Sequence, residues 1–302
     1  MRRRRDSAVR AARAAAICGV AIALLATGCA GSGSSSKIQV VGSFYPLAWG
    51  AEQIGGPRVE VLDLTPPGVE AHDTNLSANQ VADVEDADVV FLLGYLGFQP
   101  QVEAAARHAH GTVVELLKGL HLRPSDEKGL LADPHVWLDP VFMERIVSRM
   151  TDALALAEPD HAAGYDRRSN AVRDRLAALD SAFQSGLADC RFHNFVTTHE
   201  AFGYLAEQYG LQQIGLEGLT PEAEPSASQL QAAEEAIRRG DAAPAVFYEG
   251  TAEGERIGKV VASTLGVPAL PLGTLEFDPA PGDYLSVMRD DLASLREGLK
   301  CR

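Results

Sequence analysis

The sequence predicts an α/β protein with two lobes, each built on a central parallel sheet, joined by a long rigid helical linker. Short apolar runs of strand length alternate with amphipathic helical segments from Lys37 to about residue 140, and again after Cys190. Between these regions two helical stretches follow one another with no strand. Strand–helix alternation is typical of parallel sheets covered by helices on both faces. The helical interruption therefore separates two such units.

The first lobe is expected over residues 38–140. Strands are predicted at 38–42, 59–62, 88–93 and 112–116, with helices at 47–54, 77–86 and 99–108 between them. Pro57, after two glycines, ends the first helix, and Ser77 is a good N-cap for the second.

The linker is expected over residues 141–189 and the second lobe over 190–302. One linker helix ends at Glu158-Pro159, and a second runs from about His161 to Leu187 with apolar residues at three- and four-residue spacing. In the second lobe we predict strands at 195–197, 213–216, 245–248 and 267–272, and helices at 201–209, 226–239, 255–265 and 284–299. A rigid linker should limit hinge motion between the lobes.

Residues 1–28 have the pattern of an export signal. Basic residues precede an apolar run from Ala14 to Thr27, which is too short for a stable membrane span. The run ends in Leu25–Cys29, which looks like a bacterial lipobox, so we expect Cys29 to be lipidated; a plain secretory signal is the alternative. Residues 29–37 are rich in Gly and Ser and are expected to form a flexible tether. The predicted location is the extracytoplasmic face of the cell membrane, with a lipid anchor.

Two cysteines, Cys190 and Cys301, remain in the mature chain if Cys29 is lipidated. In an oxidising compartment such a pair usually forms a disulfide. The bond would close a loop of about 110 residues, for which chain entropy gives a large stabilisation. Two buried free thiols are the alternative.

The mature chain is strongly acidic. Removing the leader takes away six arginines and one aspartate, which leaves 21 basic and 40 acidic side chains and a formal charge of −19. Because nucleic-acid recognition needs a basic surface, the composition excludes nucleic acid as a partner.

Three histidines, each in its own short signature, are the candidate metal ligands. His72 lies in Gly68–Asp73, His135 in Asp133–Pro140 and His199 in Thr197–Phe202, more than sixty residues apart. Each follows a predicted strand or lies in the loop beyond it, and such loops face the crevice where open α/β sheets bind ligands. Three imidazoles favour Zn²⁺. The sequence therefore predicts a zinc site in a cleft between the lobes.

These signatures, together with Gly218–Ser226 and Asp283–Met288, resemble the metal-binding lipoproteins of ABC importers, of the zinc (ZnuA-like, AdcA-like) and manganese types with a TroA-like fold. The likeness covers the whole mature chain. It implies metal capture in the cleft by His72, His135 and His199, and delivery to a membrane permease. Manganese members have a carboxylate at the third position, so a histidine there indicates zinc.

The sequence leaves more than one candidate for the fourth metal ligand. Zinc relatives of one branch carry a glutamate in a Pro-Leu-Glu turn, where this chain has Gly273. Glu276, three residues later, is the first candidate, and Asp278 or a water molecule are the alternatives. Glu249 is expected either to bind the metal or to orient an imidazole. The His-rich loop of many zinc relatives is missing, because residues 118–132 contain only His121.

Other functions compete with zinc capture: manganese or iron binding in the same importer family, a zinc hydrolase, or a metal-dependent adhesin. His199-Glu200 begins like a metalloprotease helix, but residue 203 is glycine, so the His-Glu-x-x-His spacing fails. The chain has no Gly-x-Ser-x-Gly elbow. We predict a monomeric binding protein, not an enzyme. Its zinc affinity should fall below about pH 6, as free imidazoles become protonated.

Overall fold

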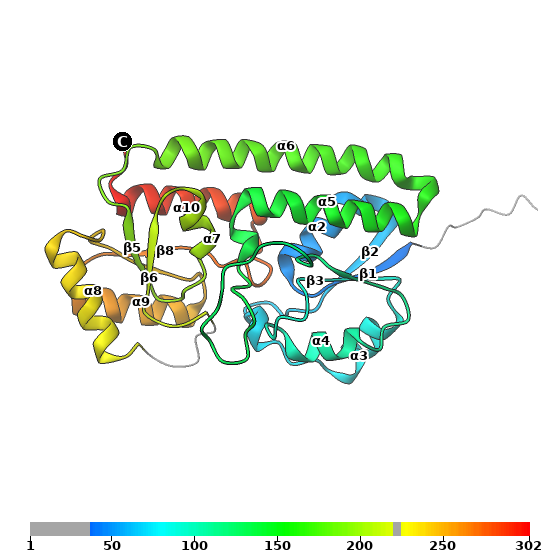
Figure 1. Ribbon diagram of the computed structural model, residues 1–302, viewed down its shortest axis with the longest axis horizontal. Helices are drawn as coiled ribbons and strands as arrows, with labels where there is room; N and C mark the ends of the chain where they lie inside the picture. Colours follow the sequence, from blue (N-terminus) through cyan, green and yellow to red (C-terminus); the bar gives the residue numbers. More distant parts are fainter. Residues whose placement is uncertain (1–36, 220–224) are drawn as a thin grey trace, which may run out of the picture. The chain divides into compact units, whose positions relative to one another are not determined.

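The computed structural model describes residues 37–219 and 225–302 (Figure 1). The expected signal peptide over 1–28 and the lipidation site Cys29 lie outside these residues, as does the predicted tether apart from Lys37. In the described ranges, no helix combines the length and the apolar character that crossing a membrane requires. Two parallel sheets with helices packed against them form the fold, which confirms the predicted α/β class.

The first sheet has the strand order β2-β1-β3-β4. Its strands are β1 (Ile38–Gly42), β2 (Val59–Asp63), β3 (Val89–Leu92) and β4 (Thr112–Glu115). Helices α2 (Tyr45–Gly55), α3 (Ala78–Asp86) and α4 (Pro100–Ala106) connect them, with 3-10 turns η1 (Gly56–Arg58) and η2 (Ala71–Asp73). Ser77 caps α3 in a reciprocal capping box with Gln80, as its sequence position predicted.

The second sheet repeats this arrangement in the order β6-β5-β7-β8. Its strands are β5 (Asn194–Thr197), β6 (Gln212–Gly215), β7 (Val246–Tyr248) and β8 (Ala269–Pro271), and its helices are α7 (Gly203–Gln208), α8 (Ala227–Arg239), α9 (Ala252–Leu265) and α10 (Tyr284–Leu299). Helix α7 is shorter than the predicted 201–209, because Ala201 and Phe202 belong to the loop that follows β5.

Two helices connect the sheets. The turn η3 (Val136–Leu138) leads into α5 (Pro140–Ala157), and Asp139 caps that helix by accepting the Val141 N–H at 2.8 Å. After η4 (Pro159–His161), helix α6 (Ala162–Leu187) packs against α2 of the first lobe and α10 of the second (Figure 1). Its buried side chains recur every three or four residues, so one apolar stripe serves both lobes.

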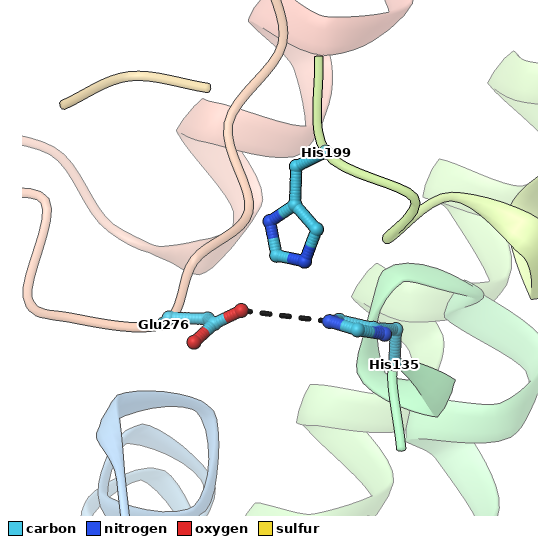
Figure 2. Close-up of side chains that lie close together, drawn as sticks. All are labelled: His135, His199 and Glu276. Atoms are coloured by element: carbon cyan, nitrogen blue, oxygen red, sulfur yellow. Dashed lines mark ion pairs between the residues drawn. The ribbon is translucent and has the colours of Figure 1, made fainter. Parts of the chain in front are cut away.

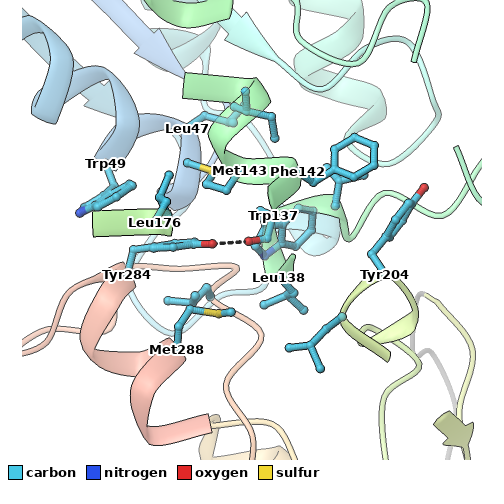
Figure 3. Packing of buried hydrophobic residues seen from close by; sticks show 14 of the residues in the cluster. Leu47, Trp49, Trp137, Leu138, Phe142, Met143, Leu176, Tyr204, Tyr284 and Met288 are labelled. Carbon is cyan, nitrogen blue, oxygen red and sulfur yellow. Dashed lines mark hydrogen bonds between the residues drawn. The ribbon is translucent and has the colours of Figure 1, made fainter. Parts of the chain in front are cut away.

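Trp137 joins the turn that follows His135 to the second lobe (Figure 3). The side chain is fully buried, and its Nε1–H donates to the Thr274 carbonyl at 2.7 Å. Tyr284, at the start of α10, donates its hydroxyl to the Trp137 carbonyl at 2.6 Å. These bonds hold the turn of the first lobe against the loop after β8, which is where a site between the lobes needs rigidity.

A disulfide connects Cys190 and Cys301, as predicted. It joins the segment between α6 and β5 to the end of the described chain, across a separation of 111 residues. The second lobe is thus closed covalently at its two ends.

Candidate metal centre

Each of the three predicted histidines lies beyond the carboxyl end of a strand. His72 is in η2, in the loop after β2, and His135 directly precedes η3, in the loop after β4. His199 follows β5 by two residues. The His199 ring centroid is 5.0 Å from that of His135 and 6.0 Å from that of His72. Parallel strands open their carboxyl ends to one edge, and here the edges of both sheets bring the three rings together.

His135, His199 and Glu276 form the inner group, whose possible ligand atoms all lie within 4.8 Å of one another. All three side chains are buried (Figure 2). His135 Nε2 lies 3.5 Å from Glu276 Oε1, and within the described residues neither atom has a hydrogen-bond partner. Two ligands about 2.0–2.1 Å from a tetrahedral Zn²⁺ are about 3.3 Å apart. The pair is therefore spaced as metal ligands are.

Carboxylates orient the two histidines of the inner group. Asp133 Oδ1 lies 2.9 Å from Nδ1 of His135, and Arg123 Nε lies 3.4 Å from the other oxygen of Asp133. Glu249 Oε2 lies 3.0 Å from Nδ1 of His199, a position from which it can orient that ring. Metal-binding histidines usually donate their second ring N–H to such a group, which fixes the ring and its tautomer.

His72, Glu70 and Glu276 form the outer group, in which Glu276 is shared with the inner group. His72 Nδ1 lies 3.2 Å from Asp73 Oδ1, while its Nε2 lies 2.7 Å from Glu70 Oε2 and 4.0 Å from Glu276 Oε2. The Ala71 N–H donates to the same Glu276 oxygen at 2.9 Å. Glu276 thus presents one carboxylate oxygen to each group.

His199 has a second contact that metal binding must change. Its Nε2 lies 3.0 Å from the Leu219 carbonyl, while Nδ1 faces Glu249. A ring nitrogen that binds a metal through its lone pair carries no proton. It therefore cannot donate a hydrogen bond to a carbonyl. Coordination through Nε2 therefore requires the Leu219 contact to be given up.

The charges around the rings raise the pKa of all three histidines. Burial lowers the pKa of His72, but the hydrogen bond with Glu70 and the charge of Glu276 outweigh it and raise the value to about 9. Burial acts in the same direction on His199, and Glu249 raises the pKa of that ring to about 10. Zinc must displace these protons to bind.

The carboxylate of Glu276 shifts in the opposite direction. Burial raises its pKa, but the contact with His135 and the charges of His72 and His199 lower it to about 2. Burial also lowers the pKa of His135, and Asp133 together with Glu276 raises it above its ordinary value. Glu276 therefore carries a full negative charge at neutral pH, as a metal ligand should.

The structure separates the candidates for the fourth ligand. Glu276 lies among the histidines, whereas Asp278 belongs to none of the ligand groups in the described residues and accepts the Ala280 N–H at 3.1 Å. A Cβ at Gly273 would lie 2.6 Å from Val287 Cγ1, so a larger residue at this position would require the Val287 side chain to shift. The carboxylate of this loop that lies among the histidines is that of Glu276, three residues further on.

No role for Glu70 or Asp133 was predicted from the sequence. Each lies two residues before a histidine, in Glu70-Ala71-His72 and Asp133-Pro134-His135. This repeated acid-x-His spacing was the available signal, because a carboxylate two positions away can reach the imidazole.

The described chain has the architecture of a two-lobed binding protein, with potential ligands from both lobes meeting at the facing edges of two parallel sheets. The family model described as the periplasmic component A of the zinc-uptake complex, ZnuA, matches residues 40–298, and the chain belongs to this family. The resemblance inferred from the motifs is confirmed. The members are components of an uptake system, not enzymes, in agreement with the predicted absence of catalysis.

Individual relatives agree with this assignment. The high-affinity zinc uptake system protein ZnuA of Bacillus subtilis is 29% identical over 283 residues, which are 87% of this chain and 88% of that protein. The zinc-binding lipoprotein AdcA of Streptococcus pneumoniae is 30% identical, but the matched region spans only 56% of its length. The crystal structure of the Zn(II)-bound ZnuA-like domain of AdcA has a TM-score of 0.74 at 29% identity, covering 87% of this chain and 99% of that domain.

Proposed function

We propose that this protein captures Zn²⁺ outside the cytoplasm and delivers it to the permease of an ABC importer. The observation that carries the proposal is the pair of buried atoms His135 Nε2 and Glu276 Oε1, which lie 3.5 Å apart and form no hydrogen bond within the described part of the chain. Burying polar atoms without partners costs free energy, and a cation between them removes that cost. Membership of a zinc-uptake family supports the same conclusion.

The proposed ligands are His72, His135, His199 and Glu276. Three imidazoles and one carboxylate suit the tetrahedral preference of Zn²⁺, whereas Mn²⁺ favours oxygen ligands. Glu276 is preferred to Asp278 or water as the fourth ligand, because its two oxygens face His135 and His72 at 3.5 and 4.0 Å.

The proposal extends to the chain's position in the cell and its domain limits. Residues 1–28 act as a lipoprotein signal, Cys29 carries the lipid, and residues 29–37 tether a monomer to the extracytoplasmic face of the membrane. A relative named as a lipoprotein supports this assignment. The lobes comprise residues 38–140 and 190–302, with the linker over 141–189; helices α5 and α6 occupy most of that interval.

A zinc titration against a competing chelator tests the ligand set. His135→Ala should weaken zinc binding by more than about 100-fold, since even the loss of outer partners of metal ligands costs 10–100-fold. His121→Ala is the matched control, because His121 is exposed and belongs to no ligand group in the described chain. Equal affinities of the two variants would refute the site, and tighter binding of Mn²⁺ than Zn²⁺ would refute the choice of metal.

A further inference from the structure

Glu70 differs from Asp73, Asp133 and Glu249 in the ring nitrogen that it contacts, because these three carboxylates lie beside Nδ1. Asp73 lies beside Nδ1 of His72, the arrangement that orients a ring. Glu70 Oε2 instead lies 2.7 Å from Nε2, the nitrogen that also faces Glu276. Glu70 therefore occupies the side of His72 on which the metal binds, and orientation of the ring does not explain its place.

Glu70 also connects the ligand groups. It is a member of the outer group with His72 and Glu276, and of a third group with His199 and Glu249. The outer group shares Glu276 with the inner group, and the third group shares His199. The two groups that contain Glu70 therefore each have one potential ligand in common with the inner group.

The exposed fraction of the side chains falls from the outer group to the inner group. The Glu70 side chain is 13% exposed and that of His72 is 4% exposed, whereas those of His135 and Glu276 are fully buried. An ion arriving from solvent therefore meets Glu70 before the inner group.

We propose that the outer group is a transit subsite for Zn²⁺, in which Glu70 is the first ligand on entry and the last on exit; this rests on the proposed function. In the subsite a water molecule is the fourth ligand; the ion then keeps His72 and Glu276 while His135 and His199 replace, one after the other, Glu70 and that water. Four coordination positions cannot hold all the available donors at once. Exchange of one ligand at a time keeps the ion coordinated in a buried site, where an uncompensated charge is costly.

Stopped-flow kinetics of zinc binding, and of zinc release to a chelator, test the proposal on the purified protein and Glu70→Gln. A transit ligand speeds both directions equally, so the variant should bind and release zinc at least about tenfold more slowly while its affinity changes less than about threefold. Asp278→Asn is the control, because it removes one exposed carboxylate from the segment after Glu276 and retains the acceptor for Ala280. Its rates should match those of the unmodified protein.

Three outcomes would overturn the transit subsite. An affinity loss in Glu70→Gln as large as in Glu276→Gln would make Glu70 a resident ligand. Unchanged rates would remove it from the path, and equal slowing in Asp278→Asn would reduce its effect to general electrostatics. Failure of the unmodified protein to bind zinc would instead refute the proposed function, which separates the two ideas. Thermal unfolding of each metal-free variant verifies that its fold is intact.

Discussion

The two lobes share one strand order but orient their histidines differently. In the first lobe, the carboxylate on His135 is Asp133, two residues away, and lies 2.9 Å from the ring. In the second lobe, the partner of His199 is Glu249, fifty residues further along the chain and beyond a different strand. The first arrangement is formed by one loop. The second exists only because β5 and β7 pair side by side.

Glu276 belongs to the second lobe by its place in the sequence, but its carboxylate contacts residues of the first lobe. The Ala71 N–H donates to one of its oxygens, and His135 faces the other. Nearby, Trp137 of the first lobe donates to the Thr274 carbonyl in the same loop. The site is therefore held together mainly by first-lobe contacts to a second-lobe loop.

Removing the covalent closure of the second lobe should have the largest effect on the fold. The double substitution Cys190→Ser and Cys301→Ser is expected to lower the free energy of unfolding by up to about 4–5 kcal/mol, because the unfolded chain regains the freedom of a long loop. Urea unfolding followed by circular dichroism measures the loss. An unchanged unfolding midpoint would show that the lobe does not depend on the bond.

His199 of the inner group and His72 of the outer group should differ in how much each contributes to zinc affinity. His199→Ala removes a member of the inner group and should weaken zinc binding by more than about 100-fold. His72→Ala leaves that group intact and should cost about tenfold less. Calorimetric titration of both variants gives the order, and a larger loss for His72→Ala would reverse the roles assigned to the two groups.

Asp133 is near its histidine in the sequence, whereas Glu249 is distant from its own. Removing the charge of each carboxylate compares these two ways of orienting an imidazole. Asp133→Asn and Glu249→Gln should each weaken zinc binding by about 10–100-fold, the usual cost of losing a partner of a metal-binding histidine. Chelator competition measures both affinities. If only one variant loses affinity, only that lobe depends on its carboxylate to orient the imidazole.

The pH dependence of zinc affinity follows from the protons that zinc must displace. An ordinary histidine predicts a loss of zinc affinity only below about pH 6, but the pKa of His72 is raised to about 9. Below that value zinc must displace a proton, so affinity should rise about tenfold per pH unit for each proton released, from pH 6 towards 9. Titrations in buffers of different ionisation enthalpy count the protons. A constant affinity between pH 7 and 9 would contradict the raised pKa.

The stability of the metal-free protein should fall as the pH rises, whereas its zinc affinity should increase. A folded-state pKa raised to about 9 for His72 and about 10 for His199 stabilises the fold fully below their unfolded value of about 6.5. This contribution is lost as the pH rises through 9 to 10. Thermal unfolding in a chelator should therefore show a falling midpoint over that range, and a rising midpoint would refute the assignment.

Much of the fold was predictable because its signals are local. Strand-length apolar runs and helical spacing placed the elements, and Ser77 caps the helix that it was expected to cap. The start of α7 and the roles of Glu70 and Asp133 were not predicted. The acid-x-His spacing indicates that Glu70 and Asp133 lie near the histidines, but it does not indicate which ring nitrogen each carboxylate reaches.

The sequence by itself determined the strand–helix alternation, the three histidines beyond strand ends and the pair of cysteines that can bond. Only the tertiary structure decided that Glu276 and not Asp278 lies among the histidines, that Glu249 reaches His199, and that Glu70 lies on Nε2 of His72. The reason is physical. Periodicity and capping depend on neighbours in the chain, whereas the direction of a ligand atom depends on how loops from two sheets pack against each other.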